Sequence, residues 1–375
     1  MRILVAFGTR PEIIKLGPVC RELSRRPDTV LEVFWTGQHI ELAVGLLDLF
    51  EIHVDHIGVD VMQEPGLAGK FGQISRQIET LLRAEHFDWI IVQGDTTTAA
   101  AASLAGFSNK VPVAHVEAGL RTGDLASPWP EEFNRRIITL SSSLHFAPTH
   151  ISARNLAREG VGEDAIEMVG NTIVDALLYT RDKVRHDYTP IDPQLASLPR
   201  NKKLVLATLH RRENIGEPIR EILRALRELG EDGDKVITLP VHMNPEVRAE
   251  VLSILGDAPN VFLLGPLQYP DFVHMLDQAW TVVTDSGGVQ EEAPTFGLQI
   301  LITRESTERP ECIEAGFGTL VGSNRQTIID SVRRLTSSEE PQFIKAQNPF
   351  GDGMASLRIV DRLTALIPSQ VCAAE

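Results

Sequence analysis

The 375-residue chain carries 51 acidic and 36 basic residues, for a formal net charge of −15. No run of Lys or Arg is longer than a pair, so the sequence argues against a nucleic-acid partner. Three widely spaced cysteines, Cys20, Cys312 and Cys372, favour reduced thiols over a disulfide framework, and no apolar segment has the length of a membrane span. We therefore expect a cytoplasmic protein without a membrane partner.

Short apolar runs alternate with helix-length amphipathic segments, which is typical of parallel βαβ units with helices on both faces of the sheet. In the first half, strands are predicted at 3–7, 31–35, 88–92, 111–116, 144–147 and 167–169, and helices after the first strand and at 40–50, 67–86 and 99–105. Segment 185–201, with three prolines, interrupts this pattern and is interpreted as a loop in or near a domain junction. Strands are then predicted at 204–207, 236–239, 261–264, 281–284 and 299–302, and helices at 215–229, 245–254, 269–278 and 288–296. The fold class is α/β with two Rossmann-like, doubly wound domains, predicted at 1–170 and 171–352.

The first predicted strand ends in Gly8-Thr9-Arg10-Pro11-Glu12 and leads into a helix that carries Lys15. Because helix N-termini bind anions, Arg10 and Lys15 indicate a phosphate site, although Arg10 could equally be a surface residue. Gly17-Pro18 lies inside the predicted helix and could kink it or end it early.

Acidic residues follow two predicted strands and open a later helix. Asp95 follows one strand, Glu117 follows the next, and Glu131 and Glu132 come directly after Pro130. Open α/β sheets bind ligands at the carboxyl ends of their strands, and acids that gather at such places favour acid–base chemistry. The alternative is that each carboxylate caps a helix or pairs with an arginine.

In the second half, His210 and Arg211 follow the first predicted strand, and His242 lies in a similar strand-end turn. A histidine beside arginines suits a diphosphate or an acid–base step. The segment TDSGGVQEEA (284–293) pairs two glycines with a helix start, where a backbone can approach a phosphate, and Glu292 lies within reach of a ribose. The alternative is a tight turn that needs glycine for its geometry alone.

Neither a glycine-rich dinucleotide motif nor a P-loop occurs in the sequence, and no His/Cys cluster has the spacing of a zinc site. We therefore expect no cofactor and no metal.

Seven motifs in this order resemble the non-hydrolysing UDP-N-acetylglucosamine 2-epimerases along nearly the whole chain: FGTRPE (7–12), QGDTTT (93–98), HVEAGLRTGD (115–124), PWPEE (128–132), HRREN (210–214), TDSGGVQEEAP (284–294) and TERPE (307–311). The resemblance implies a B-type glycosyltransferase-like fold with the active site in an interdomain cleft. It also implies a homodimer and a C-terminal helix (353–375) that packs back on the first domain.

The resemblance implies reversible epimerisation at C2 of UDP-N-acetylglucosamine to UDP-N-acetylmannosamine. The implied catalytic residues are Asp95, Glu117, Glu131 and His210. The implied substrate-binding residues are Arg10, Lys15, His242, Phe272, Ser286, Gly287, Gly288, Glu292 and Arg309, with Phe272 near the uracil.

The C2 proton of this sugar is not acidic, so we expect UDP to leave C1 first, which gives a 2-acetamidoglucal to which UDP adds back. Asp95 and Glu131 are the expected proton carriers, and Glu117 is expected to support positive charge near C1. Three alternatives stay open: a hydrolysing relative that releases N-acetylmannosamine and UDP, a glycosyltransferase of the same fold, and a non-catalytic sensor of nucleotide sugars.

Overall fold

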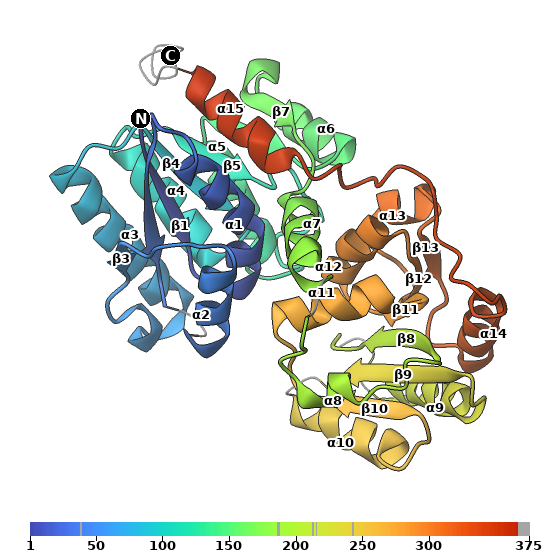
Figure 1. The fold of residues 1–375 in the computed structure, drawn as a ribbon. Helices are drawn as coiled ribbons and strands as arrows, with labels where there is room; N and C mark the ends of the chain where they lie inside the picture. The colour runs from blue at the N-terminus through green and yellow to red at the C-terminus, as the bar shows by residue number, and fades with distance from the viewer. Residues whose placement is uncertain (38–39, 186–187, 212–213, 215, 242–243, 367–375) are drawn as a thin grey trace. The chain divides into compact units, whose positions relative to one another are not determined.

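The computed structural model describes residues 1–375 except 38–39, 186–187, 212–213, 215, 242–243 and 367–375. The chain divides into two compact units, one from Met1–Ala176 with the described part of Gly351–Glu375 and one from Leu177–Phe350. Each unit contains one parallel sheet with packed helices (Figure 1). The predicted α/β class with two doubly wound sheets is confirmed.

The first unit has seven strands: β1 (Arg2–Phe7), β2 (Val30–Trp35), β3 (His56–Ile57), β4 (Trp89–Gln93), β5 (Val113–Val116), β6 (Leu144–Ala147) and β7 (Ile166–Met168). Its helices are α1 (Arg10–Ser24), α2 (Ile40–Leu49), α3 (Gly66–Ala84), α4 (Thr97–Ser108), α5 (Glu131–Ser141), α6 (His150–Arg158) and α15 (Ala355–Ala365), with short 3₁₀ turns at Val61–Gln63 and Glu163–Ala165. Helix α7 (Thr172–Val184) begins in this unit and ends in the second.

The second unit has six strands: β8 (Lys203–Thr208), β9 (Lys235–Pro240), β10 (Val261–Leu264), β11 (Thr281–Thr284), β12 (Gln299–Ile302) and β13 (Gly318–Leu320). Its helices are α8 (Pro193–Ala196), α9 (Glu217–Glu231), α10 (Pro245–Leu255), α11 (Tyr269–Gln278), α12 (Gly287–Glu292), α13 (Pro310–Glu314) and α14 (Arg325–Leu335), and the 3₁₀ turn η4 (Ala293–Phe296) follows α12.

The two sheets share one strand order. It is β3-β2-β1-β4-β5-β6-β7 in the first unit and β10-β9-β8-β11-β12-β13 in the second. In each sheet the first three strands are added in one direction from the first strand, and the chain then crosses to the opposite side of that first strand. This crossing places β1 beside β4 and β8 beside β11. Ligands bind at such a reversal point, beyond the carboxyl ends of the two strands.

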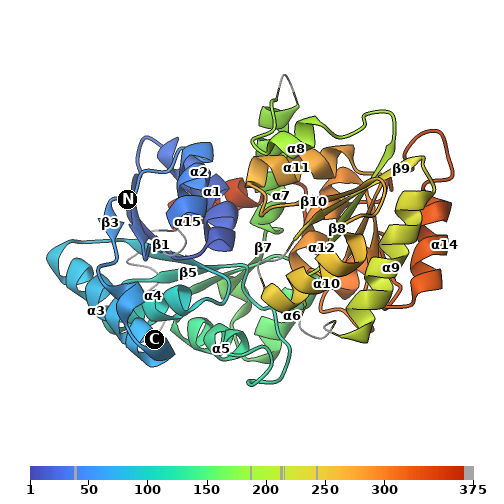
Figure 2. The ribbon, with the colours of Figure 1, turned by 90° about the horizontal axis from the view of Figure 1, so that it is seen from below.

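The cores follow from the sequence pattern of the strands and helices. Strand β4 is buried along its whole length, as a strand covered on both faces must be. Helix α4 is rich in alanine and packs between α3 and α5, where small side chains allow close approach. In the second unit, α9 buries Ile219, Ile222, Leu223 and Leu226 along one helical face and lies beside α14 (Figure 2).

The C-terminal helix α15 packs on the first unit beside α1, although the whole second unit separates them in the sequence (Figure 1). Asp175 on α7 accepts hydrogen bonds from the backbone N–H groups of Ala355 and Ser356, at 3.2 and 2.8 Å, and so caps α15. Burial raises the pKa of Asp175, while these donors act in the opposite direction. Arg26 on the loop after α1 also pairs with Asp361 at 2.5 Å.

The early helix end predicted as one alternative at Gly17-Pro18 is wrong, because α1 continues to Ser24. An internal proline costs a helix about 3 kcal/mol. The turns after it bury Val19, Cys20 and Leu23, and each buried aliphatic side chain contributes about 1.5 to 3 kcal/mol. Packing therefore outweighs the lost hydrogen bond.

Gly17 lets α1 approach Phe50, because a Cβ at position 17 would lie 2.4 Å from the buried ring of that residue. We expect Gly17→Ala to lower the free energy of unfolding by about 1 to 3 kcal/mol through overpacking. The matched control is Gly72→Ala on α3, where an added Cβ meets only Arg76 at 3.5 Å. The free energy of unfolding of this control variant should equal that of the wild type or exceed it by up to about 1 kcal/mol. Equal free energies of unfolding of the two variants in urea would show that the Phe50 ring can move to admit a Cβ at position 17.

Candidate active site

The turn after β1 is organised by Glu12, a buried carboxylate in the first turn of α1. It accepts hydrogen bonds from the backbone N–H groups of Gly8 and Thr9, at 3.0 and 2.8 Å, and from the hydroxyl of Thr96 at 2.7 Å. Burial raises the pKa of Glu12, and the donors lower it in part. This network joins the carboxyl end of β1 to the start of α4 and so sets the position of Arg10, the first residue of α1.

Glu117 follows β5 and lies in the left-handed backbone region, with φ of 62°. A residue other than glycine is uncommon there and is typical of functional sites. Its carboxylate accepts hydrogen bonds from Lys15 at 2.5 Å and from the amide of Gln93, and Asn171 lies at 3.4 Å. Lys15 and Glu117 are 14% and 10% exposed, so this ion pair is largely shielded from solvent.

Asp95 follows β4 and is held by α5. Arg135 contacts Oδ2 of Asp95 through Nε at 2.9 Å and through a terminal nitrogen at 2.7 Å, which leaves Oδ1 outside these bonds. Asn134 donates a hydrogen bond to the backbone carbonyl of Asp95 at 2.8 Å. A Cβ at Gly94 would lie 3.8 Å from a carboxylate oxygen of Glu117, so Glu117 reaches the same turn.

The two acids at the start of α5 have different surroundings. The side chain of Glu132 is fully buried and accepts hydrogen bonds from the N–H of Thr122 at 3.1 Å and from Arg135 at 3.0 Å. Burial raises the pKa of Glu132, but these donors reverse the effect and leave the pKa below its ordinary value. Oε2 of Glu131 and Oε1 of Glu132 are both buried without a hydrogen-bond partner among the described residues. Glu132 is fixed through its other oxygen, Oε2, which Thr122 and Arg135 hold.

Two histidines lie behind the acids and remain neutral. His115 on β5 bonds to the carbonyl of Gly94 at 2.8 Å, and burial lowers its pKa to about 3. Burial likewise lowers the pKa of His145 on β6 to about 4. Both rings are therefore uncharged near neutral pH and support the sheet without adding charge.

In the second unit, Asp285 directly follows β11 and orients the loop that follows β8. It is fully buried and accepts hydrogen bonds from the backbone N–H groups of His210 and Arg211, both at 3.0 Å, and from Asn214 at 2.9 Å. Nδ1 of His210 lies 3.1 Å from the same carboxylate. A carboxylate at Nδ1 sets the tautomer and the orientation of the imidazole ring.

The adjoining turn brings two guanidinium groups to Gly287, the first residue of α12. A Cβ at this position would lie 3.5 Å from Arg211 and 4.0 Å from Arg309. Ser286 is the N-cap of α12, and Gly288 leaves the backbone uncovered. Nε of Arg211 is buried without a hydrogen-bond partner among the described residues, which leaves a buried donor to be satisfied by an anion. The arrangement suits a diphosphate.

The structure therefore places the predicted residues in two groups. In the first unit, Lys15, Asp95 and Glu117 lie around the reversal point between β1 and β4, with Glu131 on the helix that holds Asp95. In the second unit, His210, Ser286, Gly287, Gly288 and Arg309 surround the reversal point between β8 and β11. Glu292 ends α12, Phe272 is half-buried on α11, and their roles stay predictions. The predicted site residue His242 lies outside the described residues.

Sequence reasoning missed several residues that position this site. Arg135 and Asn134 are ordinary positions of an amphipathic helix, and only their spacing of three or four from Glu131 could have placed them on its face. Asp285 and Glu12 lie in motifs that indicate no role for either residue. Arg211 follows His210 in the sequence, but this position alone does not identify it as a binding residue.

Two Rossmann-like units, one with gathered carboxylates and one with arginines beside a glycine turn, define an α/β enzyme with acid–base groups and an anion-binding turn. Residues 21–364 match the model of the family described as UDP-N-acetylglucosamine 2-epimerase. The chain belongs to this family.

Individual relatives agree with the family match. The UDP-N-acetylglucosamine 2-epimerase of Escherichia coli O157:H7 is 43% identical over 370 residues, which cover 97% of this chain and 98% of that protein. The crystal structure of UDP-GlcNAc 2-epimerase from Neisseria meningitidis bound to UDP-GlcNAc is 39% identical, with a TM-score of 0.86 over 98% of this chain and all of that chain. The enzyme from Methanocaldococcus jannaschii is 33% identical, with a TM-score of 0.84 over 98% of this chain and all of that chain. In the described part of this chain, no helix is long and apolar enough to cross a membrane.

The Asp285 network predicts a pH-dependent stability. Burial raises the pKa of Asp285, but the contacts with His210 and the backbone of Arg211 leave it below its ordinary value. A depressed native pKa contributes stability above the unfolded value of about 4, and this contribution is lost as pH falls through the native pKa. We expect Asp285→Asn to be less stable than the wild type at neutral pH, and the difference to shrink below about pH 4.

Urea unfolding of both proteins from neutral pH to about pH 3 measures this difference. Asp330→Asn, at an exposed position of α14, is the control and should match the wild type throughout. A difference between Asp285→Asn and the wild type that does not change with pH would contradict the charged role of Asp285.

Proposed function

We propose that this protein reversibly epimerises UDP-N-acetylglucosamine to UDP-N-acetylmannosamine at C2. The proposal rests on where the site residues lie. Carboxylates gather at the reversal point of the first sheet. Two arginines lie beside a glycine turn at the reversal point of the second sheet. Relatives whose alignments cover 97% of the chain are named for this activity.

The chemistry requires both groups of residues. The C2 hydrogen is not acidic while UDP is attached, because C2 is not adjacent to a carbonyl. When the C1–O bond breaks, UDP takes the electron pair, and positive charge at C1 acidifies C2. A carboxylate then removes the C2 proton, which forms the C1=C2 double bond of 2-acetamidoglucal. Return of UDP to C1, with a proton delivered to the other face of C2, completes the exchange.

The second unit holds the nucleotide in this proposal. Arg211, Arg309 and the backbone at Ser286–Gly288 receive the diphosphate, whose charge grows as the C1–O bond breaks. His210, oriented by Asp285, is assigned to the departing phosphate. Glu292 accepts from the ribose hydroxyls, and Phe272 and His242 are assigned to the uridine as implied by the family resemblance.

The first unit carries the proton transfers. We assign them to Asp95 and Glu131, since each has an oxygen outside the hydrogen bonds that hold the site. Glu117, shielded beside Lys15, supports positive charge at C1, and Arg10 faces the sugar diphosphate. Glu132 serves as a structural anchor for α5.

Gly8-Thr9-Arg10-Pro11 favours the non-hydrolysing reaction, since the hydrolysing relatives typically have Gly-Ser-Arg-Ala at this turn. We also infer that the protein acts in the cytoplasm, which the buried free thiols of Cys20 and Cys312 support.

Incubation with UDP-N-acetylglucosamine in deuterium oxide tests the proposal. We expect deuterium at C2 of both epimers with the UDP-sugar conserved, because the removed proton exchanges with solvent before it is replaced. Asp95→Asn should lower kcat by at least about 100-fold and leave UDP binding intact. Asp48→Asn, at an exposed position of α2, is the control and should keep full activity.

Other products would support other functions. Free N-acetylmannosamine accumulating with UDP would identify a hydrolysing enzyme. An unchanged substrate in the presence of a bound UDP-sugar would identify a sensor. Transfer of the sugar to an added acceptor would identify a glycosyltransferase.

We propose further that the protein is a homodimer that uses the outer surface of α4 and α5. Phe107 on α4 is 61% exposed and Leu140 on α5 is 84% exposed, with Leu104 nearby on α4. Neighbouring exposed apolar side chains are typical of protein interfaces.

Leu140→Glu should shift the protein towards the monomer, because a two-fold interface would bury this charge twice. Light scattering coupled to size-exclusion chromatography measures the mass. Leu252→Glu on α10, at a side chain that is 50% exposed, is the control and should leave the mass unchanged. A Leu140→Glu variant with the mass of the wild-type dimer would exclude this surface.

A further inference from the structure

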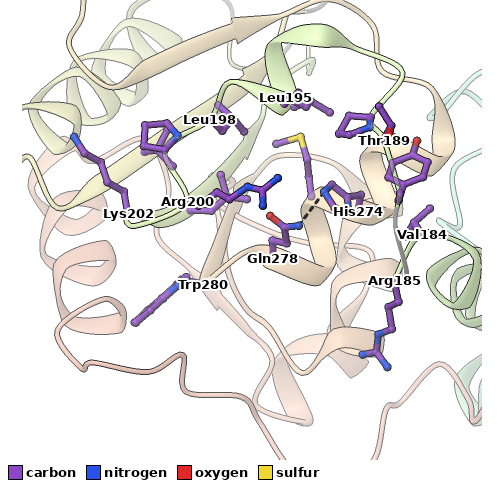
Figure 3. A pocket seen from close by; sticks show the side chains of 17 residues that line it. Val184, Arg185, Thr189, Leu195, Leu198, Arg200, Lys202, His274, Gln278 and Trp280 are labelled. Carbon is purple, nitrogen blue, oxygen red and sulfur yellow. Dashed lines mark hydrogen bonds between the residues drawn. The ribbon is translucent and has the colours of Figure 1, made fainter.

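The second unit contains a cavity of about 700 Å³ that none of the site residues lines. Residues from 184–185 and 188–204 form one side, and the last turns of α11 form the other (Figure 3). Leu204 and Val236 lie at the starts of β8 and β9, and Trp280 directly precedes β11. The cavity is therefore at the amino ends of these strands, at the edge of the sheet opposite to His210 and Asp285.

The cavity is lined by cations and by no carboxylate among the described residues, although acids outnumber bases in the chain. Arg200 lies inside it beside Gln278 and His274, and Arg185 and Lys202 lie towards its two ends (Figure 3). Lys202 donates to the neutral amide oxygen of Asn260 at 2.5 Å.

Arg200 has no ion pair or hydrogen bond with any described residue, whereas Arg185 reaches Asp277 at 3.2 Å. The side chain of Arg200 is exposed, so its guanidinium is available to a ligand that enters the cavity.

The walls of the cavity are fixed by buried hydrogen bonds. Asp271 on α11 is buried and accepts from the hydroxyl of Tyr188 at 2.7 Å and from the backbone N–H groups of Ile191 and Asp192, at 2.9 and 2.8 Å. These bonds tie the proline-rich segment to α11. The cavity therefore does not depend on a loop that is held only by its ends.

His274 contributes a neutral wall. Gln278 lies 2.8 Å from Nε2 of His274, and two nitrogens at this distance require that the amide donates and the ring accepts. Burial, together with the charge of Arg200, lowers the pKa of His274. Near neutral pH the ring is therefore uncharged, and the second amide hydrogen of Gln278 is left for another acceptor.

We propose that this cavity binds the phosphate group of a small phosphate monoester, with the phosphate at Arg200 and the rest of the molecule against Trp280 and Tyr188. Arginine binds phosphate oxygens through parallel hydrogen bonds, and Gln278 supplies a neutral donor. The volume lies within the range of about 300 to 1,000 Å³ for small-molecule sites and exceeds the need of a bare phosphate ion. This site is separate from the proposed UDP site and does not depend on it.

Calorimetric titration with AMP, inorganic phosphate and citrate tests the proposal, in protein saturated with UDP so that the proposed nucleotide site is occupied. We expect AMP to bind more tightly than phosphate, and citrate to bind weakly. Arg200→Gln should weaken AMP binding at least about tenfold, the cost of one charged hydrogen-bonding group. Arg334→Gln, at an exposed position of α14, is the matched control and should bind AMP as the wild type does.

Epimerase turnover of Arg200→Gln without AMP should equal that of the wild type, which shows that the variant is folded. Three results would overturn the proposal: no AMP binding at millimolar concentration, equal AMP affinity in the Arg200→Gln and Arg334→Gln variants, or citrate binding as tightly as AMP.

Discussion

The reversal of strand order in each sheet is the constraint on which the functional residues depend. In both units the chain builds outward from a first strand, then crosses to its other side, so two adjacent strands send their following loops in opposite directions. The space beyond their carboxyl ends is left uncovered by helices. Gly8 to Glu12 and Asp95 occupy this place in one unit, and His210 and Asp285 occupy it in the other. One topological rule thus gives two sites with different chemistry.

What differs between the units is how buried charge is balanced. In the first unit, Arg135 lies between Asp95 and Glu132 and neutralises acids that would otherwise repel each other. Removing one member of such a buried set leaves the others uncompensated, which costs more than the pair contributes. In the second unit the buried carboxylate of Asp285 is satisfied by backbone N–H donors and not by an arginine. The guanidinium of Arg211 keeps a buried nitrogen for a ligand. An arginine therefore holds the acids that are proposed to move protons, whereas backbone donors hold the carboxylate beside the arginine that is proposed to bind an anion.

The sequence predicted strands well where their apolar runs are continuous. Strands β6, β10, β11 and β12 and helix α11 have the predicted bounds. Strands β3 and β13 were not predicted, since a strand of two or three partly exposed residues leaves no periodic signal. Likewise, α8 lies in a segment that its prolines mark as a loop.

The site was predictable where a residue follows a strand directly, as Asp95 and Glu117 do. Arg135, Asn171 and Asp271 could not be found in this way, because their partners are 40 or more residues away in the chain or their spacing is that of any helix face. The cavity around Arg200 gives no motif at all, since its lining comes from a linker, a helix end and the first residues of three strands.

The proposed epimerisation requires that UDP leaves C1 and returns in each catalytic cycle. Positional isotope exchange measures this step directly, with ¹⁸O placed in the oxygen that bridges C1 and the β-phosphate. If UDP departs and rotates before it returns, the label moves to the non-bridging positions of recovered UDP-sugar while C2 epimerises. Epimerisation with the label fully retained in the bridge would contradict the claim.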